Sequence, residues 1–270
     1  MEFHKMHGLG NDFIVIDSRH QDIDLSACNW QQLAHRRNGI GCDQFLILEH
    51  GSNGATAAYK VRNADGSPAE QCGNGIRCLA MYLKNRGEIT GGHILLAGPA
   101  GNVQVQCMAD GSYRVNMGQP CFDSPDLPDS LEAQNNLYPL AIQSGSIDIG
   151  LVSMGNPHAV IIDSPGFDER LGAEITTHPA FPKGCNAGFA NVLNRGEISL
   201  QVYERGSGPT LACGSGACAA VAVLRLLGRV DGRVFVGQPG GRLVIEWHGT
   251  GKDLWMSGPA AYVYKGQTDI

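Results

Sequence analysis

Short apolar or alternating runs, each bounded by turn residues, dominate the hydrophobic pattern of the chain. Runs of this length, rich in Val, Ile, Leu and aromatic residues, are typical of β-strands. We predict strands at 13–17, 45–49, 93–98, 102–108 and 113–117, and again at 158–163, 198–204, 233–238 and 243–248. The pattern therefore favours a protein with many short strands and few helices.

Two segments depart from this pattern and predict helices, "IRCLAMYLKNRG" at 76–87 and "ACAAVAVLRLLG" at 217–228. Each follows directly on a CGxG turn and ends at a glycine, Gly87 or Gly228, which is the usual C-terminal stop. The second helix has no polar side chain except a thiol over its first two turns, so it must be enclosed on every face. A curved sheet wrapped around such a helix makes the fold class α+β rather than alternating βαβ.

The chain also repeats itself, because paired landmarks recur in the same order. The pairs are "GNDFIVID" from 10 with "GNPHAVIID" from 155, "NGIGCDQFLIL" from 38 loosely with "NAGFANVLN" from 186, and "CGNG" from 72 with "CGSG" from 213. The starting positions differ by 141 to 148 residues in all three pairs. We therefore expect two pseudo-symmetric domains, each a curved, mixed, barrel-like sheet around a central helix.

The stretch "GQPCFDSPDLPDS" at 118–130 is rich in Pro, Asp and Ser and lacks periodicity, so it predicts the domain boundary. The expected domains are residues 1–118 and 119–270, with a C-terminal tail of about 262–270 that can return to the first. A length of 270 residues is sufficient for two domains with cores of their own.

Composition and net charge limit the classes of molecule that the protein can be expected to bind. The formal net charge is −6 and Lys and Arg are scattered, which argues against a nucleic-acid or anionic-membrane surface. No apolar run reaches the roughly 18 to 20 residues that span a bilayer, and the N-terminus lacks the apolar core of a signal peptide. We therefore expect a cytoplasmic protein that binds a small molecule.

Nine cysteines form an odd set, and a reducing compartment disfavours a complete disulfide framework. Cys72 and Cys78 are six apart, and Cys213 and Cys218 are five apart, so neither pair has the C-x2-4-C spacing of structural zinc. We expect no metal. Seven cysteines are interpreted as small buried hydrophobes: Cys28, Cys42, Cys78, Cys107, Cys121, Cys185 and Cys218.

Cys72 and Cys213 are different, because each precedes a predicted helix. A helix N-terminus offers unpaired N–H groups and the positive end of the macrodipole, which favour a thiolate and a bound carboxylate. If an approximate twofold relates the halves, the two turns can face each other across an interdomain cleft, with the active site between them. A thiolate base and a thiol acid on opposite faces of one carbon are what inversion at a proton-bearing centre requires. Either thiol must be able to start as the base.

Four stretches carry a resemblance to a known family: "HGLGNDF", "NADGSPAEQCGNGIRC", "GNPHAV" and "ERGSGPTLACGSGACAA". They resemble the diaminopimelate epimerases, which interconvert LL- and meso-diaminopimelate without a cofactor on the bacterial route to lysine and peptidoglycan. The resemblance continues to the terminal "GPAAYVYKG", so it covers essentially the whole chain.

The resemblance implies roles for particular residues. Cys72 and Cys213 would be the catalytic acid and base, with His158 and Glu204 assisting. Substrate contacts would come from Asn11, Gln44, Asn63, Gly73, Asn74, Asn156, Asn186, Glu204, Arg205, Gly214 and Ser215, and Tyr264 would contribute to a homodimer contact. Without the resemblance, the asparagines would be interpreted as turn formers beside glycine, and His158 as a structural histidine.

Two positions depart from the family pattern, and three other functions stay open. The family often has Glu shortly after its ERG stretch, where this chain has Pro209, and often has Val where Cys185 stands. A related proline or hydroxyproline racemase would share the two-cysteine chemistry. A thiol-disulfide redox protein would use the same two cysteines differently. A binding module without chemistry is a third alternative.

Overall fold

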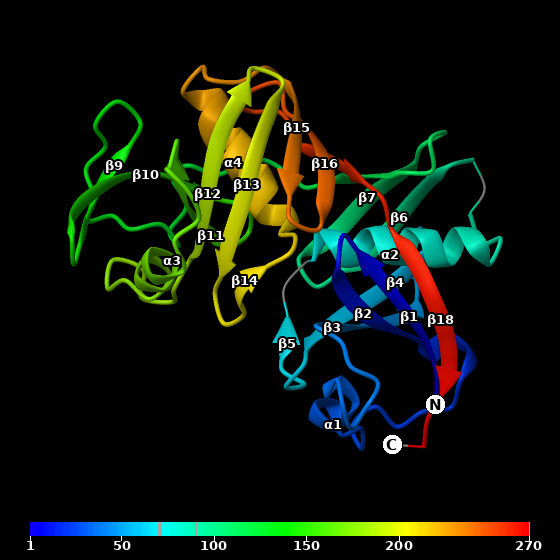
Figure 1. The fold of residues 1–270 in the computed structure, drawn as a ribbon. Coiled ribbons are helices and arrows are strands. Elements are labelled where there is room, and N and C mark those ends of the chain that lie inside the picture. The colour runs from blue at the N-terminus through cyan, green and yellow to red at the C-terminus, as the bar shows by residue number, and fades with distance from the viewer. Residues whose placement is uncertain (70–71, 90, 270) are drawn as a thin grey trace. The chain divides into compact units, whose positions relative to one another are not determined.

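The computed structural model describes residues 1–69, 72–89 and 91–269 (Figure 1). The chain divides into two compact units, Met1–Asn116 with Gly258–Ile270, and Met117–Ser257. The C-terminal segment thus belongs to the first unit. Each unit is considered by itself below.

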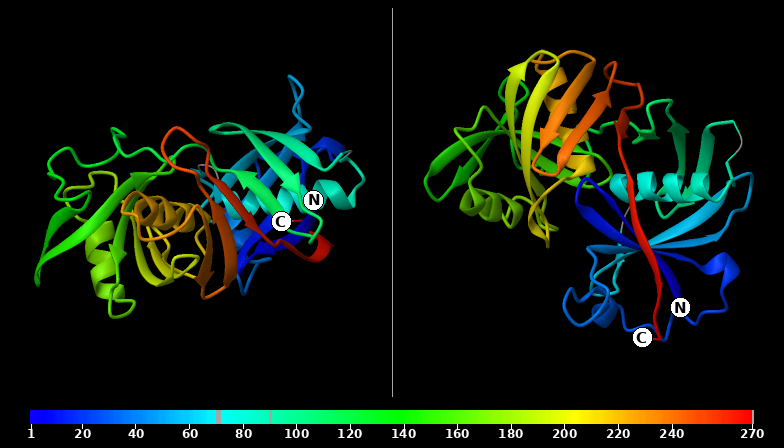
Figure 2. Two further views of the ribbon diagram at one scale, coloured as in Figure 1. Left: turned by 90° about the horizontal axis from the view of Figure 1, so that it is seen from above. Right: turned by 45° about the vertical axis from the view of Figure 1, so that its right-hand side comes forward.

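The first unit is built of strands around one long helix. Its elements are β1 (Glu2–Gly8), β2 (Asn11–Asp17), a 3-10 turn η1 (Ser18–His20), α1 (Trp30–Ala34), β3 (Gln44–His50), β4 (Ala57–Asn63), β5 (Pro68–Ala69), α2 (Gly73–Asn85), β6 (His93–Gly98), β7 (Gly101–Cys107), β8 (Tyr113–Asn116) and β18 (Ala261–Gln267). The last strand, β18, pairs antiparallel with the first, β1, and the two lie side by side in both Figure 1 and Figure 2.

The second unit has the same kind of construction. Its elements are β9 (Tyr138–Ile142), β10 (Gly145–Ser153), β11 (Pro157–Ile162), α3 (Glu169–Thr176), β12 (Asn186–Asn194), β13 (Glu197–Glu204), β14 (Gly208–Thr210), α4 (Gly214–Leu226), β15 (Arg233–Gln238), β16 (Gly241–Glu246) and β17 (Trp255–Gly258), whose last residue already belongs to the first unit.

Strand pairing follows the same sequence of directions in both units. In the first, β1–β2 is antiparallel, β2–β3 parallel, β3–β4 antiparallel, β4–β6 parallel and β6–β7 antiparallel. In the second, the series β10–β11, β11–β12, β12–β13, β13–β15 and β15–β16 alternates in the same way. The predicted α+β fold of two pseudo-symmetric, sheet-dominated halves is confirmed.

Both predicted helices are present, but each begins three residues earlier than the sequence pattern indicated. The helices start at Gly73 and Gly214, so the cysteines before them are the N-cap residues. Gly87 and Gly228 follow the helix ends with φ of +74° and +69°, a backbone conformation that suits glycine. The CGxG glycines therefore lie inside the first helical turn rather than in a preceding loop.

The all-apolar α4 is enclosed, as its sequence required. Its side chains from Ala217 to Leu224 are all buried, and the helix packs against β10, β11, β12 and β16. The corresponding α2 packs against β1, β2, β7, β8 and β18 but keeps an exposed end at Lys84 and Asn85. Further apolar clusters include Trp30 and Leu33 of α1 in the first unit and Ile175 of α3 in the second. Burial of apolar surface stabilises by about 25 cal/mol per Å².

One alignment within the repeat is wrong. The sequence comparison loosely matched position 38 with position 186, but strand register matches Gln44 with Asn186. Gln44 pairs with Phe13 on β2, and Asn186 pairs with His158 on β11. The error arose because the loop before β3 contains an Asn-Gly pair of its own, which resembles the start of β12 more closely than the true counterpart does.

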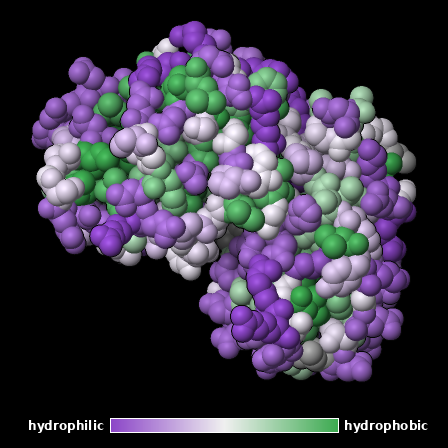
Figure 3. Space-filling model, in the orientation of Figure 1, coloured by the Kyte–Doolittle hydropathy of each residue, from purple (hydrophilic) through white to green (hydrophobic). Residues whose placement is uncertain are grey.

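In the view of Figure 3, hydrophilic residues cover most of the visible face and hydrophobic ones form small patches. None of the helices in the described part of the chain is long and apolar enough to cross a membrane.

Candidate active site in two halves

Cys72 is positioned by the N-terminus of α2. It caps the helix with φ of −116° and ψ of 107°, and its side chain is half-buried. The thiol donates to Asn11 Oδ1 at 3.7 Å, and Asn74 Nδ2 donates to the same oxygen at 3.2 Å. Asn11 begins β2, so a strand end and a helix start meet at this cysteine.

Gln44 and Asn63 form a second polar pair in the first unit. They are direct partners in the β3–β4 ladder, and Gln44 Nε2 donates to Asn63 Oδ1 at 3.1 Å. Asn63 Nδ2 in turn donates to Ser67 Oγ at 3.0 Å, which fixes the orientation of the Asn63 amide. Gln44 is also the parallel-strand partner of Phe13, two residues beyond Asn11.

Cys213 occupies the equivalent N-cap of α4, with φ of −116° and ψ of 114°, but its environment is more enclosed. Only 4% of the residue is exposed. Its sulfur accepts the Gly216 N–H at 3.3 Å and lies 3.6 Å from Ser215 Oγ. Its backbone N–H donates to Gln238 Oε1 at 2.8 Å.

Burial raises the pKa of Cys213 well above its ordinary value, and the nearby Glu204 charge raises the pKa further. Hydrogen bonds from Ser215 and Gly216 act in the opposite direction but do not outweigh burial. Glu204 ends β13 and accepts a hydrogen bond from Thr210 Oγ1 at 2.5 Å. This environment therefore favours the thiol form of Cys213 over the thiolate.

Asn156 and His158 lie at the start of β11. His158 Nε2 is 3.0 Å from Asn156 Oδ1, and the imidazole is almost completely buried. Burial lowers the pKa of His158 to about 3, and the positive charge of Arg205 contributes in the same direction. The imidazole is neutral at physiological pH. Its Nε2 faces an amide oxygen, which can only accept, so the contact requires the tautomer with the proton on Nε2.

The Asn186 side chain is hydrogen-bonded to the backbone of Arg205. Asn186 Oδ1 accepts the Arg205 N–H at 2.9 Å, and Arg205 Nη1 donates to the Lys183 carbonyl at 2.9 Å. Asn186 is the direct partner of His158 in the β11–β12 ladder. Gly184 packs against the Arg205 side chain, where an added Cβ would lie 3.0 Å from Arg205 Cδ.

The predicted residues thus gather into one set in each unit. Asn11, Gln44, Asn63, Cys72, Gly73 and Asn74 belong to the first, and Asn156, His158, Asn186, Glu204, Arg205, Cys213, Gly214 and Ser215 to the second. Tyr264 lies on β18, where its ring contacts Phe3 edge-on at 6.0 Å between centroids.

The two departures from the family pattern leave these sets intact. Pro209 lies in β14 opposite Tyr203, so the β13–β14 ladder is kept. Cys185 is fully buried, its thiol donates to the Ile175 carbonyl, and burial raises its pKa to about 12. This thiol is therefore unreactive at neutral pH.

Sequence reasoning missed three residues that hold the predicted ones. Asp43 accepts a hydrogen bond from Asn11 Nδ2 at 3.0 Å, Gln238 holds the Cys213 N–H, and Thr210 holds Glu204. Asp43 had a weak signal, because it directly precedes Gln44. Gln238 had none, since only the fold brings β15 to the start of α4.

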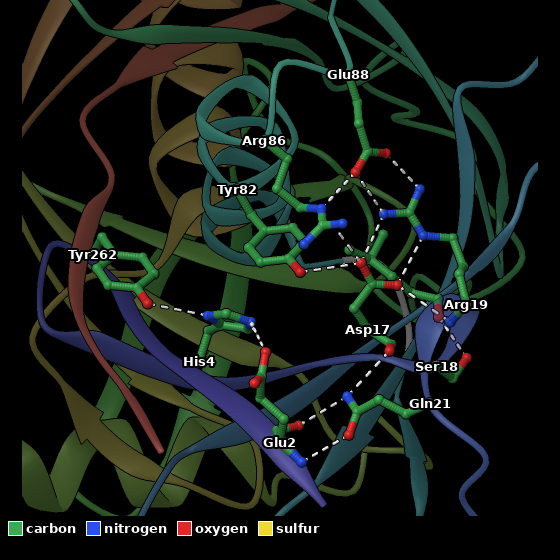
Figure 4. A network of polar contacts seen from close by, with 11 residues as sticks. Glu2, His4, Asp17, Ser18, Arg19, Gln21, Tyr82, Arg86, Glu88 and Tyr262 are labelled. Atoms are coloured by element: carbon green, nitrogen blue, oxygen red, sulfur yellow. Dashed lines mark hydrogen bonds and ion pairs between the residues drawn. The ribbon is translucent and has the colours of Figure 1, made fainter. Parts of the chain in front are cut away.

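One group among the described residues has the spacing of a metal site, Asp17 with His20 and Glu88. Its carboxylates already bind the Arg19 guanidinium, with Asp17 at 2.7 Å and Glu88 at 2.7 Å (Figure 4). A cation would have to displace this arginine, so the group is better described as an internal ion network than as a metal centre.

Comparison with known proteins places these sets in context. The family model described as diaminopimelate epimerase matches residues 3–122 and 150–263. Proteins named diaminopimelate epimerase from Thioalkalivibrio sulfidiphilus and Chromobacterium violaceum are 48% and 44% identical, each over 100% of this chain and 99% of the relative.

Solved structures share the fold at much lower identity. A hydroxyproline epimerase from Agrobacterium vitis, solved with bound trans-4-hydroxy-L-proline, has a TM-score of 0.71 and 18% identity, covering 98% of this chain and 91% of the other. A Bacillus anthracis protein of the PhzF family has a TM-score of 0.72 and 14% identity, covering 100% and 99%.

Proposed function

Because the chain belongs to the diaminopimelate epimerase family, we propose that it interconverts LL- and meso-diaminopimelate in lysine biosynthesis. The observation that carries the proposal is a cysteine at the same N-cap position of the central helix in both halves. The family match supports the substrate, since two relatives with that name align over the entire chain.

In the proposed mechanism Cys72 and Cys213 act on opposite faces of one α-carbon. One thiolate removes the α-proton and becomes a thiol, and the electron pair of the broken C–H bond passes into the α-carboxylate. The other cysteine delivers its S–H proton to the opposite face and becomes a thiolate. One proton is taken and one is returned, so the step needs no oxidant, reductant or cofactor.

Helix N-termini supply the stabilisation that this carbanion needs. The first-turn N–H groups at Gly73 and Asn74, and at Gly214 and Ser215, are oriented toward the start of their helices. Aimed at a carboxylate, such groups stabilise the charge that builds up as the proton leaves. Burial, which raises the pKa of Cys213, suits this thiol to be the proton donor in the turnover direction that begins at Cys72.

The remaining predicted residues would hold the rest of the substrate. We assign Arg205 to the distal carboxylate, because a guanidinium can bind a carboxylate through two parallel hydrogen bonds. Asn11, Gln44, Asn63, Asn156, Asn186 and Glu204 would supply the directional contacts that distinguish ammonium from carboxylate at a fixed chirality. His158, being neutral and bonded to Asn156, would orient that amide rather than exchange protons itself.

Isotope exchange tests the proposal directly. Wild-type protein incubated in D2O with LL-diaminopimelate should place deuterium at the α-carbon, whereas L-proline should stay unlabelled. Cys72→Ser and Cys213→Ser should each lower epimerisation by about a thousandfold or more, because each removes one proton-transfer group. Cys107→Ser, a half-buried cysteine on β7, is the matched control and should stay active. Labelling of proline alone, or full activity in either site variant, would refute the assignment.

Two of the alternative functions, the proline-type racemase and the thiol-disulfide protein, are not favoured. A proline-type racemase shares the fold with this chain at 18% identity, which says nothing of the substrate. A thiol-disulfide protein would need no substrate-binding polar set, whereas each cysteine here lies among amide and carboxylate side chains.

We also propose a cytoplasmic homodimer that uses β18. Tyr262, Val263 and Tyr264 are 40%, 52% and 42% exposed on three successive positions, an unusual run of large apolar side chains on a surface. A second copy of the chain is the proposed occupant. Sedimentation should show a dimer for wild type and a shift toward monomer for Tyr264→Ala, and an unchanged dimer would contradict the role of this strand.

A further inference from the structure

The amide of Asn11 has a fixed orientation in the first unit. Its Nδ2 donates to Asp43 Oδ2 at 3.0 Å, and its Oδ1 faces both the Cys72 thiol at 3.7 Å and Asn74 Nδ2 at 3.2 Å. A carboxylate can only accept hydrogen bonds, so Asp43 requires the nitrogen end of the amide. The oxygen end must then point to the cysteine.

Asp43 is itself held by groups that do not touch Cys72. Its Oδ2 accepts the Asp12 N–H at 3.1 Å, its Oδ1 accepts Arg36 Nη2 at 2.7 Å, and its own N–H donates to Asp12 Oδ1 at 3.0 Å. These reciprocal bonds join the starts of β2 and β3. The carboxylate therefore stays in place whatever the state of the thiol.

In the second unit, the equivalent asparagine amide is held at its opposite end. Strand register matches Phe13 with His158 and Gln44 with Asn186, so Asn11 corresponds to Asn156 and Asp43 to Cys185. No carboxylate stands at position 185, and Asn156 is held instead at its oxygen, by His158 Nε2 at 3.0 Å. One amide is anchored through its nitrogen and the other through its oxygen.

We propose that Asp43 is a positioning residue of the epimerase site, which turns the Asn11 amide so that an acceptor oxygen faces Cys72. This inference rests on the proposed function for the catalytic role of Cys72. An acceptor oxygen favours the protonated thiol and aligns its S–H bond, whereas an amide N–H in the same place would favour the thiolate. Asp43 thereby sets how readily Cys72 gives up and regains its proton.

The test measures the pH profile of Cys72 alkylation by iodoacetamide, with the Cys72 peptide quantified by mass spectrometry. Asp43→Ala removes the charged acceptor that fixes Asn11 Nδ2 and leaves Asn11 Oδ1 with the weaker neutral bond from Asn74 Nδ2 at 3.2 Å. The amide N–H can then turn toward sulfur, so the midpoint should move to lower pH by about one pH unit. Asp110→Ala is the matched control. Like Asp43, Asp110 accepts hydrogen bonds from a backbone N–H and a side chain, here both of Ser112, but it lies in an exposed turn away from the Cys72 group of residues. It should leave the midpoint unchanged.

Two further variants separate positioning from the loss of a negative charge. In an Asn11→Ala background, Asp43→Ala should produce no additional shift, because the amide through which it acts is gone. Asp43→Asn keeps an acceptor oxygen for Asn11 and Asp12 and should retain the wild-type midpoint. An equal shift in the Asn11→Ala background, a shift in Asp43→Asn as large as in Asp43→Ala, or no shift in folded Asp43→Ala would each overturn the proposal.

The outcome is independent of the substrate assignment. Alkylation needs no substrate, so a shifted Cys72 profile can be seen even if deuterium exchange fails, and exchange can succeed while the profile stays fixed. Circular dichroism establishes that each variant is folded. If Asp43→Ala does not fold, Asp43→Ser serves in its place, because its hydroxyl is too short to reach the Asn11 amide.

Discussion

The two halves share the order and direction of their strands but differ in how they hold the central helix. In the first, Tyr82 on α2 donates to Asp17 Oδ2 at 3.0 Å, and Asp17 pairs with Arg19, whose side chain is only 6% exposed (Figure 4). In the second, the buried residues of α4 are glycine, alanine, valine, leucine and one cysteine. The same backbone arrangement thus accommodates either charged or apolar side chains around the central helix. The two halves therefore share their strand topology but not the residue types of their interiors.

A second difference between the halves concerns the side chains at one pair of positions on two neighbouring parallel strands, β4 and β6 in the first half and β13 and β15 in the second. In the first half, Ala57 on β4 is the parallel-strand partner of Leu96 on β6. The equivalent partners in the second half are Ile198 on β13 and Val236 on β15. Two residues further on, the first half therefore has Tyr59 and Gly98 where the second has Leu200 and Gln238. Tyr59 fills the space beside Gly98, and Gln238 reaches the Cys213 N–H. Large and small side chains have exchanged strands between the halves.

The largest expected effect comes from breaking the ion network of the first half. Arg19→Ala removes the guanidinium 2.7 Å from Asp17, whose side chain is 4% exposed, and leaves only the more distant Arg86 at 4.0 Å among the ion pairs described for Asp17. The variant should lower the free energy of unfolding by about 3 to 5 kcal/mol. The control is Arg195→Ala in the second half, where Arg195 and Asp231 are 60% and 57% exposed and the expected loss is about 0 to 1 kcal/mol. Urea unfolding measures both, and equal losses would show that burial does not distinguish the two pairs.

The exchanged side chains give an intermediate effect. A Cβ at Gly98 would lie 2.4 Å from the Tyr59 hydroxyl and 2.6 Å from its ring, so Gly98→Ala should cost about 2 kcal/mol through overpacking. Tyr59→Leu copies the second half and opens this space. In that background Gly98→Ala should cost much less, as thermal unfolding of the four proteins in the double-mutant cycle would show. Strict additivity would mean that the two positions do not share the space.

Much of the fold could be predicted because the strongest signals are local. Strands 93–98 and 233–238 were predicted with their observed bounds, and both central helices were found within three residues of their true start. The elements that were not predicted are the helices α1 and α3 and the strands β1, β4, β5, β9, β10, β12, β14, β17 and β18. Most of these have weak alternation, or depend on a distant partner, as β18 depends on β1.

In the candidate site, too, the residues with a local sequence pattern could be predicted and those that depend on tertiary contacts could not. Cys72 and Cys213 could be chosen from the sequence because a cysteine before a glycine-rich helix start is a local pattern. The groups that orient them are non-local: Gln238 comes from a strand 25 residues after Cys213, and Asn11 and Asp43 meet only through the parallel pairing of β2 and β3. Sequence pattern identifies reactive groups, whereas tertiary pairing determines their orientation.

Acidification distinguishes the halves by a smaller and graded effect. In the first half, burial alone would raise the pKa of Asp17, but hydrogen bonds and charge from Arg19 outweigh it and the pKa is lowered. The stability from this carboxylate is present above its unfolded pKa of about 4 and is lost as pH falls through the lower folded value. In the second half, the pKa of His158 is lowered from 6.5 to about 3 by burial and by Arg205.

Between those two values the unfolded chain binds a proton at His158 that the folded chain does not, so stability falls with falling pH from about 6.5. The slope from one such proton is at most about 1.4 kcal/mol per pH unit. His158→Gln, which keeps a donor for Asn156 but cannot titrate, should flatten the plot of unfolding free energy against pH between 4 and 6. His50→Gln, at an exposed position, should leave the slope unchanged. An undiminished slope in His158→Gln would contradict the lowered pKa of His158 as the source of the pH dependence in this range.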